Sequence, residues 1–138
     1  MQDISRRSAL TLAAATVLAG SAETAVGQGS ALNPSPATPL PKGVSRKGWG
    51  KREAMLPDYK NVQMADLIYQ PGAKSDNPSM PSDMVCHVPE GELRIKKSDG
   101  MQFTAKKGDV WTCKKGEGES AENAGKTAAI MRVIQLLA

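Results

Sequence analysis

The feature that most constrains this chain is how often its apolar runs are interrupted by turn-forming residues. From residue 61 onward, short runs that alternate in polarity or contain β-branched residues end at turns such as Pro71-Gly72, Glu90-Gly91 and Asp99-Gly100. Short strands separated by glycine turns are typical of antiparallel sandwiches and barrels. The pattern therefore predicts an all-β antiparallel fold, with strands in the segments NVQMADLIY, DMVCHV, ELRI, MQFTA and KKGDVWTC.

The last apolar segment, KTAAIMRVIQLL at residues 126–137, is the longest one and could form a strand or a short helix. Its isoleucine and valine residues favour a strand, because β-branched side chains pack well on a pleated surface. A turn signal at Asn123-Ala124-Gly125 comes directly before it. We therefore expect a strand here.

The N-terminus is typical of an export signal. Arg6 and Arg7 precede a mildly apolar run, Ala9 to Gly20, and small residues follow. That run is too short and too weakly apolar to remain in a bilayer as a spanning helix. Paired arginines before such a run favour twin-arginine export, with an ordinary secretory signal as the alternative. Residues 1–27 are predicted to be the signal, and the protein is expected to be periplasmic or secreted, with no stable membrane span once the signal is removed.

A segment rich in proline, serine, alanine and glycine separates this signal from the strands. Such a composition cannot bury enough apolar surface to offset chain entropy. Residues 28–44 are therefore predicted to be a flexible linker, and residues 45–138 to be a single β-domain.

The charge distribution gives no reason to expect a nucleic-acid partner. The formal net charge is +4, and the lysine pairs are spread along the chain rather than gathered in one stripe. Such pairs commonly flank strands and keep edges and turns soluble. Aromatic residues make up only 4% of the chain, which is too few for a base-stacking platform.

The chain contains two cysteines, Cys86 and Cys113, and no C-x-x-C pair. A zinc ribbon or a thioredoxin-type redox centre is therefore not indicated. Three interpretations remain open: two small buried hydrophobic residues, a disulfide in an exported protein, or thiols that bind a ligand or act as nucleophiles.

The spacing of the glycines resembles that of the cupin family. Gly72 and Gly91 are separated as in the first cupin motif, and Gly108, Gly116 and Asn123 fit the second. This resemblance implies a single antiparallel jelly-roll, or cupin, β-barrel. It also implies that the strands carrying the two cysteines lie side by side, so that the sulfurs come close together.

The metal ligands of the family are replaced in this chain. The two histidine places of the first motif fall on Pro78 and Met80, its glutamate place falls on Met84, and the histidine place of the second motif falls on Glu119. The glycines serve the backbone with or without a metal, whereas three imidazoles and a carboxylate serve a divalent metal. The resemblance therefore implies a barrel without the usual metal site.

Several residues are candidates for an alternative site. If Met84 points inward, strand alternation directs Cys86 inward and His87, the only histidine, away from the cavity. The residues expected to line a ligand cavity are Met80, Met84, Cys86 and Trp111, with Glu119 and Asn123 as polar groups. A soft site could hold copper, as Cu(I), or another metal through Met80, Met84, Cys86 and Glu119, unless the methionines simply fill the interior.

Glu119 has two interpretations. Inside an apolar barrel it could act as a general acid or base, whereas within EGESAEN it could be a solvated turn residue. The favoured function is an exported small-molecule-binding or accessory barrel without a metal cofactor, which could also pair with a second copy as a homodimer. The alternative is a cupin enzyme, of an oxygenase, isomerase or lyase type, that uses atypical ligands or Glu119.

Overall fold

The computed structural model describes residues 39–138; the expected signal and most of the expected linker lie outside the described residues. No helix in residues 39–138 is long and apolar enough to cross a membrane. The nine strands of this part of the chain are β1 (Val44–Glu53), β2 (Asn61–Tyr69), β3 (Lys74–Asn77), β4 (Asp83–Glu90), β5 (Glu92–Lys97), β6 (Gln102–Lys106), β7 (Val110–Cys113), β8 (Glu119–Glu122) and β9 (Ala129–Leu137).

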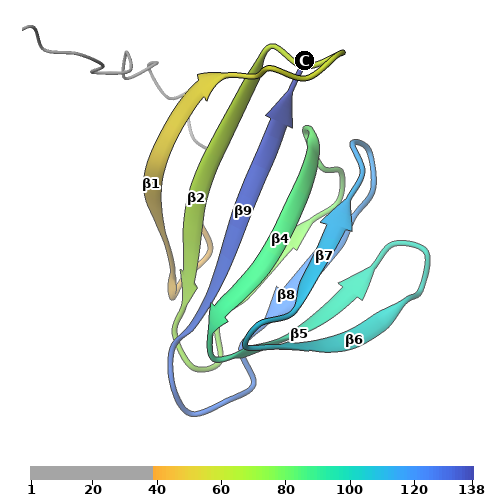
Figure 1. Ribbon diagram of the computed structural model, residues 1–138. Coiled ribbons are helices and arrows are strands. Elements are labelled where there is room, and N and C mark those ends of the chain that lie inside the picture. Colours follow the sequence, from red (N-terminus) through yellow and green to blue (C-terminus); the bar gives the residue numbers. More distant parts are fainter. Residues whose placement is uncertain (1–38) are drawn as a thin grey trace, which may run out of the picture.

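The strands form two antiparallel sheets. The larger sheet has the order β1-β2-β9-β4-β7, and the smaller one has the order β3-β8-β5-β6. In Figure 1 the smaller sheet lies on the β4–β7 side of the larger one, whereas β1 forms the opposite edge. The predicted all-β jelly-roll fold is confirmed, and so is the strand at the C-terminus, which pairs with β2 and β4 as β9.

The strands form where polar and apolar residues alternate, because successive side chains point to opposite faces. In β4 the buried residues are Met84, Cys86 and Val88, and the residues between them are less buried. In β5 the buried residues are Leu93 and Ile95. The inner faces of both sheets form one core, whose buried members are Val44, Ala65, Tyr69, Ala73, Met80, Met84, Cys86, Val88, Leu93, Ile95, Ala105, Cys113, Ala121, Ala129, Met131 and Val133.

The glycines of the cupin pattern serve the backbone, as expected. Gly72, Gly91, Gly108 and Gly116 all have positive φ angles. Gly91 has a second reason to be glycine, because a Cβ there would lie 2.8 Å from the Cα of Ala129. The β4–β5 turn therefore passes against the start of β9 at a distance that only glycine permits.

Candidate functional site

The candidate site lies between the sheets, where β5 and β8 of the smaller sheet face β4 and β7 of the larger one. Lys97 and Glu119 are directly opposite each other in the β5–β8 pairing. Residues opposite each other on neighbouring strands project to the same face. Because Ile95 of β5 and Ala121 of β8 are buried core residues, Lys97 and Glu119 project into the interior as well.

Glu119 is an interior residue and not a solvated turn residue, since only 5% of its surface is exposed. Its Oε2 atom accepts hydrogen bonds from Trp111 Nε1 and Cys113 Sγ, both at 3.0 Å. The Lys97 Nζ atom lies 3.8 Å from the same oxygen. A buried carboxylate is stable when its charge is compensated by donors and a cation, and Glu119 has both.

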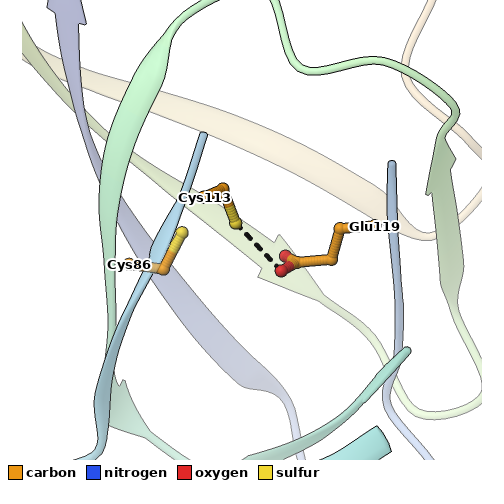
Figure 2. A group of neighbouring side chains, drawn as sticks. All are labelled: Cys86, Cys113 and Glu119. Atoms are coloured by element: carbon orange, nitrogen blue, oxygen red, sulfur yellow. Dashed lines mark hydrogen bonds between the residues drawn. The ribbon is translucent and has the colours of Figure 1, made fainter. Parts of the chain in front are cut away.

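The two cysteines meet Glu119 from the larger sheet. In the β4–β7 pairing Cys113 is opposite Met84, and Cys86 is opposite Trp111. Both cysteines are buried and free, and their sulfurs and a Glu119 carboxylate oxygen all lie within 4.8 Å of one another. Figure 2 shows the Glu119 side chain reaching toward the two sulfurs. The closeness of the cysteines implied by the cupin resemblance is confirmed.

The surroundings of Cys86 raise the pKa of its thiol and favour the protonated form. Its hydrogen-bonded neighbour Cys113 and its burial both raise the pKa of Cys86 far above the usual range. A thiol with a raised pKa is a poor nucleophile, because the thiolate is the reactive form. The Cys86 thiol is therefore not an activated nucleophile.

Lys97 is the site residue that sequence reasoning missed. As half of the Lys96-Lys97 pair it was expected to be a solvated flanking lysine, but only 11% of its side chain is exposed. Its Nζ atom donates to the carbonyl oxygen of Thr112 at 2.7 Å and lies 3.7 Å from the sulfur of Cys113. The alternation Leu93, Ile95, Lys97 was the signal that could have placed it inside.

The charge state of Lys97 is fixed by its neighbours. Burial alone lowers the pKa of Lys97, but electrostatic interactions with Cys113, Glu119 and Glu117 outweigh burial and leave the pKa raised. The carboxylate of Glu117 lies 3.7 Å from Nζ. Lys97 therefore stays an ammonium group at neutral pH, beside the Cys113 sulfur.

Tyr69 was also missed. Its side chain is fully buried, and its hydroxyl lies 2.8 Å from the Ser75 hydroxyl. Burial, opposed by the Ser75 hydrogen bond and reinforced by Glu119 and Cys86, raises the pKa of Tyr69 to about 12. This phenol stays neutral at physiological pH and forms part of the polar interior.

The other predicted site residues have different surroundings. Met80 and Met84 are buried, and the Met80 sulfur accepts a hydrogen bond from Asn77 Nδ2 at 3.3 Å. Asn123 is fully engaged by the backbone: its Nδ2 donates to the carbonyl oxygens of Tyr69 and Thr127, and its Oδ1 accepts from Gly125 N. The amide of Asn123 thus holds loops together instead of facing a ligand.

The position of His87 agrees with the prediction. It lies on the face of β4 opposite to the buried Met84, Cys86 and Val88. Its Nδ1 atom lies 3.0 Å from the carbonyl oxygen of Asp109. The only histidine of the chain is therefore placed outside the Cys86–Cys113–Glu119 cluster.

A groove of ≈ 400 Å³ opens next to this cluster. Trp111 and Lys97 connect the two, because both line the groove and both contact Glu119. The residues around the groove are Lys97, Asp99, Met101, Phe103, Trp111, Thr112, Lys114 and Glu117. Of the four residues expected to line a ligand cavity, only Trp111 lies here.

The family assignment follows from the sequence of the same region. Residues 61–132 match the model of the EutQ-like cupin domain. The chain belongs to this cupin family. The cupin resemblance of the glycine pattern is thus confirmed over residues 61–132, the part of the chain that holds the site. No curated protein matches this cupin.

Solved structures support the fold. The cupin domain of Cnp3 from Schizosaccharomyces pombe superposes with a TM-score of 0.58 at 18% identity, covering 75% of this chain and 71% of that one. A protein of unknown function from Rhizobium leguminosarum gives 0.57 at 22% identity, with 71% and 85% covered. A putative ethanolamine utilization protein Q from Salmonella typhimurium gives 0.53 at 18% identity, with 67% and 68% covered.

The metal site usual in cupins does not fit the residues of this chain. At the family's ligand places, Pro78 is exposed and has no side-chain donor atom, and Met80 and Met84 offer neutral thioethers. Thioethers suit soft ions and are weak ligands for iron, manganese or zinc. Only Glu119 keeps an ionisable ligand at its place, and its partners are two thiols instead of imidazoles.

Proposed function

We propose that this cupin is an exported binding module that holds a small organic ligand in the groove beside Trp111. The groove itself is the observation that carries the proposal. Its ≈ 400 Å³ lies within the range of about 300–1,000 Å³ that is usual for small-molecule sites. Its wall combines the apolar side chains of Met101, Phe103 and Trp111 with charged groups at the rim.

The aromatic wall of the groove is held in place. The Trp111 indole donates to Glu119, and its ring meets the edge of Phe103 with centroids 5.6 Å apart and planes at 79°. A preorganised wall lowers the entropy cost of binding, since little side-chain freedom remains to be lost. Met101 is 56% exposed, so its thioether is available to a ligand.

The rim charges indicate the ligand class. Lys97 and Lys114 contribute two positive charges, and Asp99 and Glu117 contribute two negative ones. Because these charges balance, a strongly charged ligand gains little from the rim. The groove favours a neutral or zwitterionic compound with a flat apolar body over a dianion or a polycation.

Tryptophan fluorescence provides the test, because the chain contains only two tryptophans. In Trp49→Phe protein, Trp111 is the sole reporter, and a panel of neutral, zwitterionic and multiply charged aromatic compounds is titrated against it. We expect saturable quenching by neutral or zwitterionic members. Met101→Ser should weaken binding, whereas the matched Met55→Ser, at a methionine that is 99% exposed and does not line the groove, should not. Quenching that is equal in both variants would contradict the proposal.

An enzyme of isomerase or lyase type is the second candidate, with Glu119 as its acid or base. One observation favours it: the Lys97 ammonium and the Glu119 carboxylate form a pair 3.8 Å apart behind the groove. Such a pair could relay a proton to a bound substrate. A compound that is converted by the wild type, and that is bound but not converted by Glu119→Gln, would select the enzyme.

Export remains a proposal that rests on the N-terminus. Changing both Arg6 and Arg7 to lysine should retain the protein in the cytoplasm if it uses the twin-arginine route. Cell fractionation with an antibody against the protein gives the answer. Unchanged export of the double variant would favour an ordinary secretory signal.

A further inference from the structure

Three metal-ligating groups converge behind the groove. The atoms of Cys86, Cys113 and Glu119 that could bind a metal lie within 4.8 Å of one another, and all three residues are buried. They come from β4, β7 and β8, so both sheets contribute. We propose that these three side chains bind one Zn²⁺ ion behind the ligand groove, with two thiols joining Glu119 in place of the imidazoles of the usual cupin ligand set.

The spacing suits a shared ion better than a disulfide. Because Cys113 is opposite Met84, and Cys86 is opposite Trp111, the cysteines are diagonal neighbours in the β4–β7 pair. Diagonal residues have Cα atoms about 7–8 Å apart, which reaches the limit of about 7 Å for a disulfide. Two sulfurs at about 2.3 Å from one tetrahedral zinc ion are about 3.8 Å apart, which is compatible with the cluster.

The charges balance when zinc binds. Two thiolates and the Glu119 carboxylate supply three negative charges, the ion supplies two positive ones, and the Lys97 ammonium supplies the third. Lys97 already lies 3.7 Å from the Cys113 sulfur and 3.8 Å from Glu119. A donor beside a metal-bound thiolate is the kind of outer partner that strengthens metal sites.

Binding replaces protons with the ion. In the metal-free protein the Cys113 thiol donates a hydrogen bond to Glu119 Oε2 at 3.0 Å, and Cys86 is a buried free thiol. Zinc binding forms two zinc–sulfur bonds and one zinc–oxygen bond, and it releases both thiol protons to solvent. The carboxylate oxygen in the set favours zinc over Cu(I), which prefers sulfur donors alone.

The test is a zinc titration of the purified mature protein after reduction and chelator treatment, in competition with a chromophoric chelator. We expect one Zn²⁺ per chain, release of two protons at neutral pH measured with an indicator dye, and thiolate-to-cobalt absorption when Co²⁺ replaces zinc. Cys86→Ser and Cys113→Ser should each weaken zinc binding by at least about 100-fold, since even an outer partner is worth about 10- to 100-fold.

Glu119→Gln and Glu117→Gln form a matched pair, because both carboxylates contact Lys97 but only Glu119 belongs to the cluster. Zinc binding should weaken in the first variant and stay within about 3-fold of wild type in the second. Circular dichroism and thermal melting of each metal-free variant show whether it is folded, and Cys→Ala variants replace any serine variant that is not.

Four results would overturn the proposal. They are a folded, fully reduced protein that binds no zinc; zinc binding that survives both cysteine changes; tight binding of Cu(I) but not of zinc; and a Cys86–Cys113 disulfide in protein isolated from its own compartment. None of these depends on the ligand groove, so failure of the fluorescence panel and failure of the zinc site are separate results.

Discussion

Two partly buried ion pairs in the described part of the molecule differ in geometry. On the outer face of the larger sheet, Arg132 donates to both carboxylate oxygens of Asp66, at 2.8 and 2.9 Å. Between the sheets, the Lys97 ammonium stays 3.8 Å from Glu119 and donates instead to the carbonyl oxygen of Thr112 at 2.7 Å. The outer pair is a closed two-point contact, whereas the inner pair is open and shares its carboxylate with Cys113 and Trp111.

This difference in geometry indicates that the outer pair is a structural contact and that the inner pair belongs to a functional site. In a bidentate pair both carboxylate oxygens accept hydrogen bonds from the same guanidinium group, which fixes the orientation of the carboxylate. Trp49 stacks over the outer pair, with the Arg132 guanidinium carbon 5.4 Å from its ring centroid, so this pair has little capacity for other chemistry. The inner carboxylate contacts a thiol, an indole and an ammonium group, each of which can be displaced by a ligand or an ion.

Removing the cation from each pair should have unequal consequences for stability. Arg132→Met leaves the Asp66 carboxylate almost fully buried without its partner, which should cost about 3 kcal/mol. Lys97→Met leaves Glu119 with the Trp111 and Cys113 hydrogen bonds and should cost about 1 kcal/mol. Urea denaturation of metal-free protein at neutral pH measures both values. Equal losses would show that the inner pair is as structural as the outer one.

Acid titration provides the control for the outer pair. The hydrogen bonds from Arg132 hold the pKa of Asp66 below its usual value. The stabilisation is therefore complete above the pKa of the unfolded chain, near 3.8, and is lost as the pH falls through the lower folded value. Asp66→Asn should remove this part of the acid dependence, and the Arg132→Met penalty should shrink over the same pH range. A penalty that is constant down to acidic pH would contradict the ion pair as its source.

The loss of folding stability at alkaline pH should test the burial of Tyr69 in the core. Tyr69 has a folded pKa of about 12 against 10.0 in its unperturbed state, so above pH 10 the unfolded chain loses the phenolic proton first. Stability should fall as the pH rises from 10 to 12, by up to about 2.7 kcal/mol, because one pKa unit corresponds to about 1.36 kcal/mol. Tyr69→Phe should remove this loss. The Tyr59→Phe variant measures how much of the loss comes from Tyr59. A Tyr69→Phe protein that loses as much stability between pH 10 and 12 as the wild type would contradict the assignment to Tyr69.

The sequence was sufficient for the architecture because turns and alternation are local. Pro71-Gly72, Gly91 and the β-branched C-terminal run each act within a few residues, and the structure places turns and β9 there. The cupin resemblance then implied that the strands carrying Cys86 and Cys113 lie side by side, as β4 and β7 do. These parts of the fold needed no knowledge of side-chain partners.

The composition of the site could not be predicted in the same way. Whether Glu119 was an interior or a solvated residue depended on its pairing with Lys97 across β5 and β8, and no local pattern fixes that register. Paired lysines are usually solvated, which predicts an exposed Lys97, but in the structure Lys96 is the exposed member of the pair and Lys97 is not. The motif position of Asn123 predicts a polar group for a ligand, but the fold brings the carbonyl oxygens of Tyr69 and Thr127 to its amide, and no local pattern shows this.

The smallest expected effects on stability and zinc binding are those of changing His87, a residue of the outer face. His87 is opposite Arg132 in the β4–β9 pairing, so it belongs to the outer face, and its Nδ1 atom hydrogen-bonds the carbonyl oxygen of Asp109. His87→Gln keeps a donor of similar reach, and a partly exposed position away from the core usually tolerates such a change within about 0.5 kcal/mol. Zinc affinity should also be unchanged, whereas Glu119→Gln weakens it, and the same competition titration compares the two variants. If His87→Gln abolishes zinc binding while the protein stays folded, the only histidine is a ligand after all, and the division between a structural outer face and a chemical interior is wrong.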